Sequence, residues 1–326
     1  MRKIIILIFP ILLLTLACCV QEGPEETQAV SVQAVDHFSD EDDALLVRLQ
    51  VINDSLAMEN GLVSGTRNFR DILRGIAIIA ADIKGAIAGA KLGFSVIPGF
   101  WGFVGAGVGA IVGAAIYSAM AAIQYKAPAY DSSMDMSQEK IELVMASIPT
   151  NNEFIQEQMA EYDKVVINIP AKYEEALRVG ILHNLTLEMY VGTREIENLN
   201  ATLPSNYKKV LRSSEFKALY NGLMETPLYA ISCDSEDFGK QLESMGLERR
   251  EARIIQKFIQ GAENSVTDES SMNQLVNYYV DAIENDNTLS DDQKFAIYSA
   301  LSTGAYSMGY WCKHYENYSD SGTSNE

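Results

Sequence analysis

The sequence predicts an all-α fold, a helical array around a buried hairpin of two glycine-rich helices. Apolar residues recur at three- and four-residue steps through most of the chain, the period of a helix face. Strand-like alternation is confined to residues 165–169 and stops at Pro170. Two regularly spaced glycine series indicate a pair of closely packed helices. With 48% apolar residues, a chain of this length can bury a large core.

The first residues have the pattern of an export signal. A basic pair, Arg2 and Lys3, precedes a largely apolar run of thirteen residues, which is followed by Ala17, Cys18 and Cys19. This run is shorter than the roughly 20 residues that a membrane-spanning helix requires, so a cleaved leader is expected over the first 17 residues. The pattern resembles the lipoprotein signals of bacteria, in which the cysteine after the cut carries lipid.

This resemblance implies a protein held by acyl chains at the outer membrane or cell surface. Each buried CH₂ of a lipid chain contributes about 0.8 kcal/mol to such anchoring. Cys18 is the expected lipidation site, because small Ala17 would then occupy the last leader position. Cys19 is the alternative, with Leu16 three residues before the cut. An ordinary secretory leader with incidental cysteines is a further alternative.

Residues 18–38 are expected to form a flexible, acidic tether. Three glutamates accompany a Gly-Pro pair within residues 22–26, and no helical period begins before Ser39. Acidic residues after a lipidated cysteine also resemble the signal that directs lipoproteins of the Bacteroides group to the outer face of the outer membrane. An ordinary polar linker is the alternative.

The net charge of the chain argues against nucleic acid as a partner. Without Arg2 and Lys3, 23 basic residues face 44 acidic ones, a balance of −21. Such a charge repels phosphate backbones and anionic lipid headgroups, and no basic stripe interrupts it.

Residues 39–125 are predicted to contain three helices. The first, over 40–59, has leucines at helical spacing and ends near Asn60-Gly61. Two glycine-rich helices follow, over 68–93 and 102–124, and the Pro98-Gly99 turn folds them into a hairpin.

Glycines recur every four residues along one face of each hairpin helix: Gly85, Gly89 and Gly93, then Gly105, Gly109 and Gly113. Glycine within a helix costs about 0.5 to 1 kcal/mol relative to alanine, so close backbone packing must offset a total of roughly 3 to 6 kcal/mol. Such packing occurs both in membranes and in buried hairpins. Residues 92–124 carry no charge, whereas Asp82, Lys84 and Lys91 disfavour membrane insertion of the first helix.

The stretch Ala81-Asp82-Ile83-Lys84-Gly85-Ala86, with the later Gly-Ala repeats, resembles the glycine-zipper segment of class II bacteriocin-like peptides. It is also similar to a segment of uncharacterised proteins from Bacteroides relatives. Those proteins also carry Gly-x-x-His-Asn and Tyr-Ser-x-x-Tyr-Trp elements, which correspond to residues 180–184 and 306–311. The first resemblance implies a hairpin that can act on membranes, although this chain lacks the short length and double-glycine leader of a bacteriocin.

Residues 137–316 are predicted to form further helices: 137–147, 152–163, 172–192, 207–225, 236–245, 248–263, 269–284 and 290–315. Ser290 and Gln293 have capping-box spacing at the start of the last one. The loop 126–136 is either a domain boundary or a connection within one core that surrounds the hairpin, which is the preferred interpretation. A disordered tail is expected over 317–326.

Few residues have the spacing of a catalytic or metal-binding site. None of the three histidines has a second His or Cys at ligand spacing, so we expect no metal, no cofactor and no enzymatic activity. His183 and Asn184 are weak candidates for a functional polar site, the alternative being a polar contact between helices. Cys233 and Cys312 either form a disulfide or remain buried thiols.

These observations predict a lipid-anchored envelope or cell-surface protein with a structural or interaction role. Its expected partners are the membrane, through the N-terminal lipid, and a protein of the envelope. The alternative function is a membrane-active, bacteriocin-like effector whose hairpin inserts into a bilayer.

Overall fold

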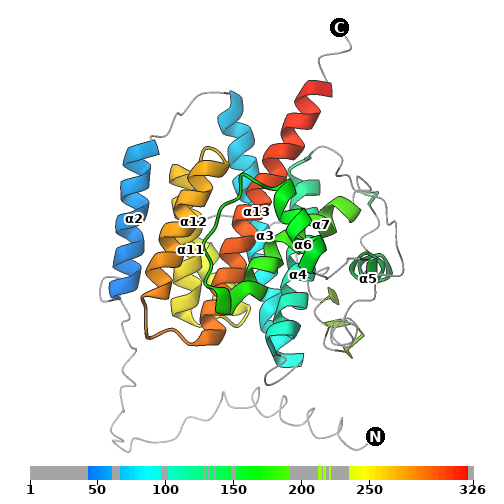
Figure 1. The fold of residues 1–326 in the computed structure, drawn as a ribbon, viewed down its shortest axis with the longest axis horizontal. Coiled ribbons are helices and arrows are strands. Elements are labelled where there is room, and N and C mark those ends of the chain that lie inside the picture. The colour runs from blue at the N-terminus through cyan, green and yellow to red at the C-terminus, as the bar shows by residue number, and fades with distance from the viewer. Residues whose placement is uncertain are drawn as a thin grey trace, which may run out of the picture. The chain divides into compact units, whose positions relative to one another are not determined.

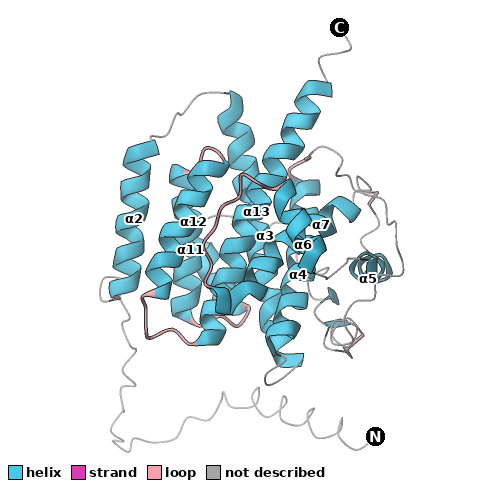
Figure 2. Ribbon diagram, viewed as in Figure 1, coloured by secondary structure: helices cyan, strands magenta, loops and turns pink. Residues whose placement is uncertain are grey.

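Helices account for 83% of the residues that the structure describes, and none of those residues is in a strand (Figure 2). This confirms the all-α prediction. The computed structural model describes residues 43–60, 67–96, 102–127, 137–147, 152–190 and 235–321, with short pieces at 130, 133–134, 212–214, 216–217 and 220–221. The predicted leader, the tether with Cys18 and Cys19, and Cys233 lie outside these residues.

The helices follow one another along the chain as coloured in Figure 1, with these bounds: α2 Ala44–Asn60, α3 Arg67–Val96, α4 Gly102–Gln124, α5 Gln138–Ser147, α6 Asn152–Glu161, η2 Ala171–Tyr173, α7 Glu174–Tyr190, α10 Ser235–Ser244, α11 Arg249–Ser265, α12 Glu269–Glu284 and α13 Asp291–Ser321. Most lie within a few residues of the expected bounds. The helix expected over 207–225 falls largely outside the described residues.

The hairpin of α3 and α4 lies at the centre of the array. The described side chains of both helices are almost all buried between residues 75 and 122. The helices α7 and α13 pack directly against the hairpin, and residues 40–326 form one compact unit. The carboxy-terminal helices and the hairpin therefore share a core, which removes a large apolar surface from water.

A second group of helices, α2, α11 and α12, packs beside α13 and α3. Asp43 caps α2, accepting hydrogen bonds from the backbone N–H of Leu45 and Leu46 at 2.9 and 3.1 Å. The guanidinium of Arg250, at the start of α11, pairs with Asp43 at 2.6 Å and with Asp286 at 2.8 Å. This pairing fixes the first turn of α2 against the loop between α12 and α13.

The last helix begins as expected and ends later than expected. The Ser290 backbone N–H donates to Gln293 Oε1 at 2.8 Å, and the Gln293 N–H donates to Ser290 Oγ at 3.3 Å, which confirms the capping box. Helix α13 then continues to Ser321, so the expected end at residue 315 and tail from 317 are wrong at this boundary. The physical reason is that no glycine or proline interrupts the sequence between Gly309 and Gly322.

Candidate functional site

The glycine faces of α3 and α4 meet backbone to backbone. A Cβ placed on Gly85, Gly89 or Gly93 would lie less than 3.0 Å from the carbonyl oxygen of Gly113, Gly109 or Gly105, respectively. The residue numbers in each pair add to the same value, so the two helices run antiparallel in one register. No side chain larger than hydrogen fits at these contacts, which explains glycine at these positions.

Each glycine pair removes a stretch of backbone from water and allows the two helices to approach closely. Such proximity favours weak Cα–H···O contacts and dense van der Waals packing. Gly107, by contrast, lies on α4 with open space where a Cβ would stand. The close approach is therefore confined to the four-residue series and does not extend to every glycine of the hairpin.

A cluster of polar side chains lies where the hairpin contacts α7 and α13. It contains Asp82 from α3, Ser118 from α4, His183 and Asn184 from α7, and Ser307 from α13, all completely buried. The hydroxyl of Ser307 donates a hydrogen bond to Asp82 Oδ2, and His183 Nε2 lies 3.7 Å from the same oxygen. Three helices thus converge on one carboxyl group.

Burial sets the protonation of Asp82 and His183 in opposite directions. Removal from water raises the pKa of Asp82 to about 7, although Ser307, Ser118 and Trp311 favour its charged form. The same desolvation lowers the pKa of His183 to about 4, and its hydrogen bond with Asn184 opposes this. Both groups consequently favour their neutral forms in mildly acidic solution.

Asn184 joins α7 to α13. Its amide donates to the backbone carbonyl of Tyr306 at 2.7 Å, and its Oδ1 lies 3.1 Å from His183 Nδ1. Nearby, a Cβ on Gly180 would lie less than 3.0 Å from backbone and side-chain atoms of Ser302, so α7 and α13 also approach closely. The Gly-x-x-His-Asn element therefore forms a helix-packing contact, with Gly180 and Asn184 on one face of α7.

The two lysines of α3 are held by helices outside the hairpin. Lys84 is buried and donates to Gln241 Oε1 of α10. Lys91 pairs with Glu251 of α11 at 3.0 Å, where the Glu251 side chain is completely buried and that of Lys91 is 30% exposed. Glu251 also accepts a bond from the Glu248 backbone N–H at 2.9 Å. Each charge on the buried face of α3 thus has a partner on a different helix.

The other predicted positions are only partly described. Cys312 is half-buried on α13, whereas Cys233 lies outside the described residues, so their disulfide stays a prediction. Within the part of the chain that the structure describes, no group of three His, Cys, Asp or Glu side chains could hold a metal ion. The aromatic residues of α13 whose side chains the structure describes are core residues, with Tyr306 and Trp311 each 1% exposed.

Sequence reasoning identified His183 and Asn184 but not their connection with Asp82 and Ser307. A signal was present, because a carboxylate within an otherwise apolar stretch requires a hydrogen-bonding partner when that stretch is buried. Its partner could not be identified, since Asp82 and His183 are about 100 residues apart in the sequence.

Comparison with protein-family models, curated proteins and solved structures finds no match for this chain. The chain is therefore classified by its fold alone, as an all-α protein that encloses a glycine-rich hairpin. Among the residues that the structure describes, one helical stretch, Gly105–Gln124, is long and apolar enough to cross a membrane, and 94% of it is buried. A core helix of a soluble protein has the same properties, so this stretch alone does not define a membrane span.

Proposed function

We propose that this chain is a lipid-anchored protein of the cell envelope or cell surface with a structural or interaction role. In this proposal the glycine-rich hairpin remains inside the helical array. The supporting observation is that Asp82, Lys84 and Lys91 each contact a helix outside the hairpin. Release of the hairpin would break all three contacts and expose both glycine-rich helices to water.

The burial of the polar cluster favours a role in packing the hairpin against its neighbouring helices over a role in catalysis. Asp82, His183 and Asn184 are each 0% exposed. A substrate would have to separate α3, α7 and α13 before reaching them. Their hydrogen bonds instead fix the orientation of the hairpin relative to α7 and α13, which is a recurrent use of buried polar groups in cores.

The anchor is tested by metabolic labelling of the expressed full chain with an alkyne analogue of palmitate. We expect label in the wild-type protein, loss of label in one of the variants Cys18→Ala and Cys19→Ala, and membrane fractionation that follows the label. Labelling of neither the wild type nor any variant, together with a cytosolic location, would overturn the anchored role.

The position of the hairpin is tested by adding dye-loaded phosphatidylcholine vesicles to the purified protein. We expect no dye release, and unchanged hydrogen exchange for the amides of α3 and α4. A Gly89→Ala variant, with its hairpin loosened, serves as the sensitised sample, and Gly107→Ala is its matched control. Vesicle-dependent loss of protection in the wild-type hairpin, with dye release, would contradict the proposal.

Membrane insertion of the hairpin is the second candidate function. It is favoured by one specific observation, the length and apolar character of Gly105–Gln124. The first hairpin helix opposes it, because a Lys or Asp at the bilayer centre costs about 2.5 to 3.5 kcal/mol on insertion scales. Dye release that is abolished by a disulfide between α3 and α13 would favour this candidate.

A further inference from the structure

Three polar side-chain atoms of the buried cluster have no hydrogen-bond partner among the described residues. They are Asp82 Oδ1 on α3, Ser118 Oγ on α4 and His183 Nε2 on α7. Each of these side chains is 0% exposed, so bulk solvent does not reach them. Buried polar atoms in proteins are nearly always paired, and an internal water molecule is a common partner. The three atoms therefore call for a shared explanation.

The three atoms gather around the Asp82 carboxyl group. His183 Nε2 lies 3.7 Å from Asp82 Oδ2, which is longer than the limit of about 3.2 Å for a direct bond between nitrogen and oxygen. The Ser118 hydroxyl is near enough to the carboxyl to oppose the rise in its pKa, yet it makes no direct hydrogen bond. Polar contacts longer than about 3.5 Å are often bridged by water.

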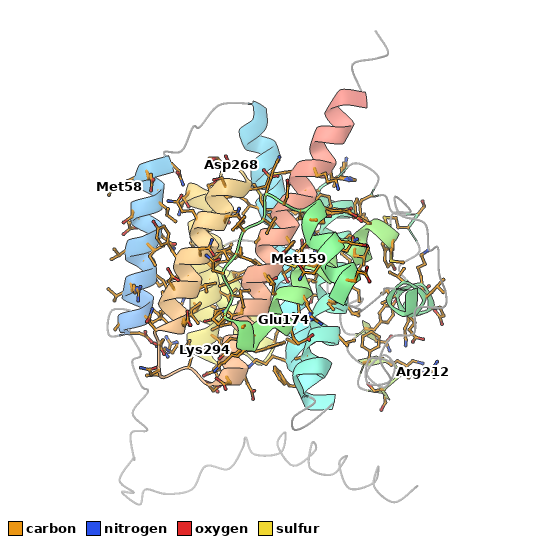
Figure 3. All side chains as sticks on the ribbon, viewed as in Figure 1. Met58, Met159, Glu174, Arg212, Asp268 and Lys294 are labelled. Carbon is orange, nitrogen blue, oxygen red and sulfur yellow. The ribbon has the colours of Figure 1, made fainter. Side chains whose placement is uncertain are left out.

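The helices that carry these atoms pack together in the core. The hairpin supplies α3 and α4, and α7 packs against both α4 and α13. In Figure 3, α7 begins at the labelled Glu174 and runs among the side chains of the core beside α4 and α13. A molecule bound to all three atoms would therefore connect the hairpin with α7.

The hydrogen bonds of Asn184 fix the tautomer of His183. The Asn184 amide nitrogen donates to the Tyr306 carbonyl at 2.7 Å, so its Oδ1 is the atom that lies 3.1 Å from His183 Nδ1. Because an amide oxygen only accepts, Nδ1 carries the imidazole proton. Burial lowers the pKa of His183 to about 4, so the ring holds no second proton at neutral pH. His183 Nε2 is therefore an acceptor that needs a donor.

The Asp82 carboxyl group sets a second requirement. Its Oδ2 already accepts from the Ser307 hydroxyl. Its Oδ1 accepts when the carboxyl is ionised and can donate when it is protonated, and a pKa of about 7 means that both forms occur near neutral pH. The bridging group must therefore donate to His183 Nε2 and adapt to either form of Asp82. Water both donates and accepts, whereas a metal ion or an ammonium ion cannot accept a hydrogen bond.

We propose that an internal water molecule bridges His183 Nε2, Asp82 Oδ1 and Ser118 Oγ, and thereby joins the hairpin to α7. The water donates to His183 Nε2, accepts from the Ser118 hydroxyl and donates its second hydrogen to the ionised Asp82 carboxylate. When Asp82 is protonated, the water accepts from Asp82 instead. Buried waters in proteins typically make about three hydrogen bonds, as this one does. The bridge places both titratable groups in one hydrogen-bond network.

A crystal structure of the wild-type chain, at a resolution that shows ordered water, tests the bridge directly. We expect a water peak at about 2.6 to 3.2 Å from each of the three atoms. A direct hydrogen bond between His183 Nε2 and Asp82, with no peak between them, would overturn the proposal. A peak that contacts only one of the three atoms would also overturn it.

Nitrogen-15 spectra of the histidine-labelled wild type test the donor requirement in solution. The variant His183→Gln identifies the His183 signals by their loss. We expect a protonated Nδ1 and an unprotonated Nε2 at pH 7. A proton on Nε2 would contradict the bridge, because that atom would then have no need of a donor.

Oxygen-17 relaxation dispersion counts the long-lived internal waters of the protein in solution. His183→Phe removes the Nε2 acceptor and enlarges the ring, so this variant should hold one such water fewer than the wild type. His314→Phe is the matched control, because the His314 ring is also buried but packs against Tyr310 and Trp311, and its count should not change. Equal counts in the wild type and a folded His183→Phe would refute the bridge. If His183→Phe does not fold, the two measurements on the wild type decide.

Discussion

Gly89 and Gly109 face each other across the α3–α4 hairpin so closely that a Cβ on either one would overlap the carbonyl oxygen of the other. The pairs of Gly85 with Gly113 and Gly93 with Gly105 extend the same register along the hairpin. This contact offsets the conformational cost of glycine in helices, because it allows two backbones to pack without intervening side chains. Adding a single methyl group at one of these glycines should disrupt the contact and measurably lower the free energy of unfolding.

Replacing Gly89 with alanine should lower the free energy of unfolding by about 3 kcal/mol or more, because the two backbones must separate to admit the methyl group. The matched change Gly107→Ala meets open space and should raise stability by up to about 1 kcal/mol through helix propensity. Urea unfolding followed by circular dichroism measures both. Equal effects of the two substitutions would be incompatible with the glycine contact.

Replacing Asp82 with asparagine should leave a variant whose stability falls in acid. The pKa of His183 is lowered from its usual 6.5 to about 4, so the unfolded state binds a proton that the folded state excludes. Stability from this group is present above pH 6.5 and is lost as the pH falls through 4. The expected loss between these values is about 3 kcal/mol. The unfolding free energy of the variant itself, measured from pH 4 to 7, checks this.

Replacing His183 with glutamine should leave a variant whose stability falls as the pH rises. The pKa of Asp82 is raised from 3.8 to about 7, so the folded state binds a proton that the unfolded state lacks. Stability from this group is present below pH 4 and is lost as the pH rises through 7. The unfolding free energy of the variant should therefore fall by about 4 kcal/mol between pH 4 and 7. An unfolding free energy of this variant that does not depend on pH would contradict the assignment.

The wild type contains both groups, and their effects should largely cancel between pH 4.5 and 6. In that range the folded pair holds one proton on Asp82, and the unfolded pair holds one proton on His183. Folding thus moves a proton from imidazole to carboxyl without net uptake. The double variant Asp82→Asn/His183→Gln should share this flat pH profile while being less stable than the wild type. Comparison of the double variant with the single variants therefore distinguishes the effect of proton binding on stability from the effect of lost packing.

Replacing Lys91 with methionine should destabilise the fold by about 1 to 3 kcal/mol, because it leaves the Glu251 carboxylate buried without its cation. Adding Glu251→Gln removes the buried charge, while the amide oxygen can still accept the Glu248 N–H bond. The double variant should then be more stable than Lys91→Met alone. A double-mutant cycle in urea measures this coupling, and strictly additive effects would argue against the ion pair.

The sequence by itself determined the helical character, the order of the helices and the hairpin. Helical periodicity, the Pro98-Gly99 turn and the Ser290–Gln293 cap are local features, and interactions between nearby residues suffice to specify them. The regular spacing of Gly85, Gly89 and Gly93 also indicated a close contact, because a row of glycines on one helix face is costly without one.

Only the tertiary structure decided which distant groups meet. It placed Asp82 beside His183 and Ser307, paired Lys91 with Glu251, and set residues 165–169 against Asn277. These partners lie about 100 or more residues apart, so no local period relates them. Their protonation and pairing depend on removal from water by several helices at once, and a linear sequence does not specify that arrangement.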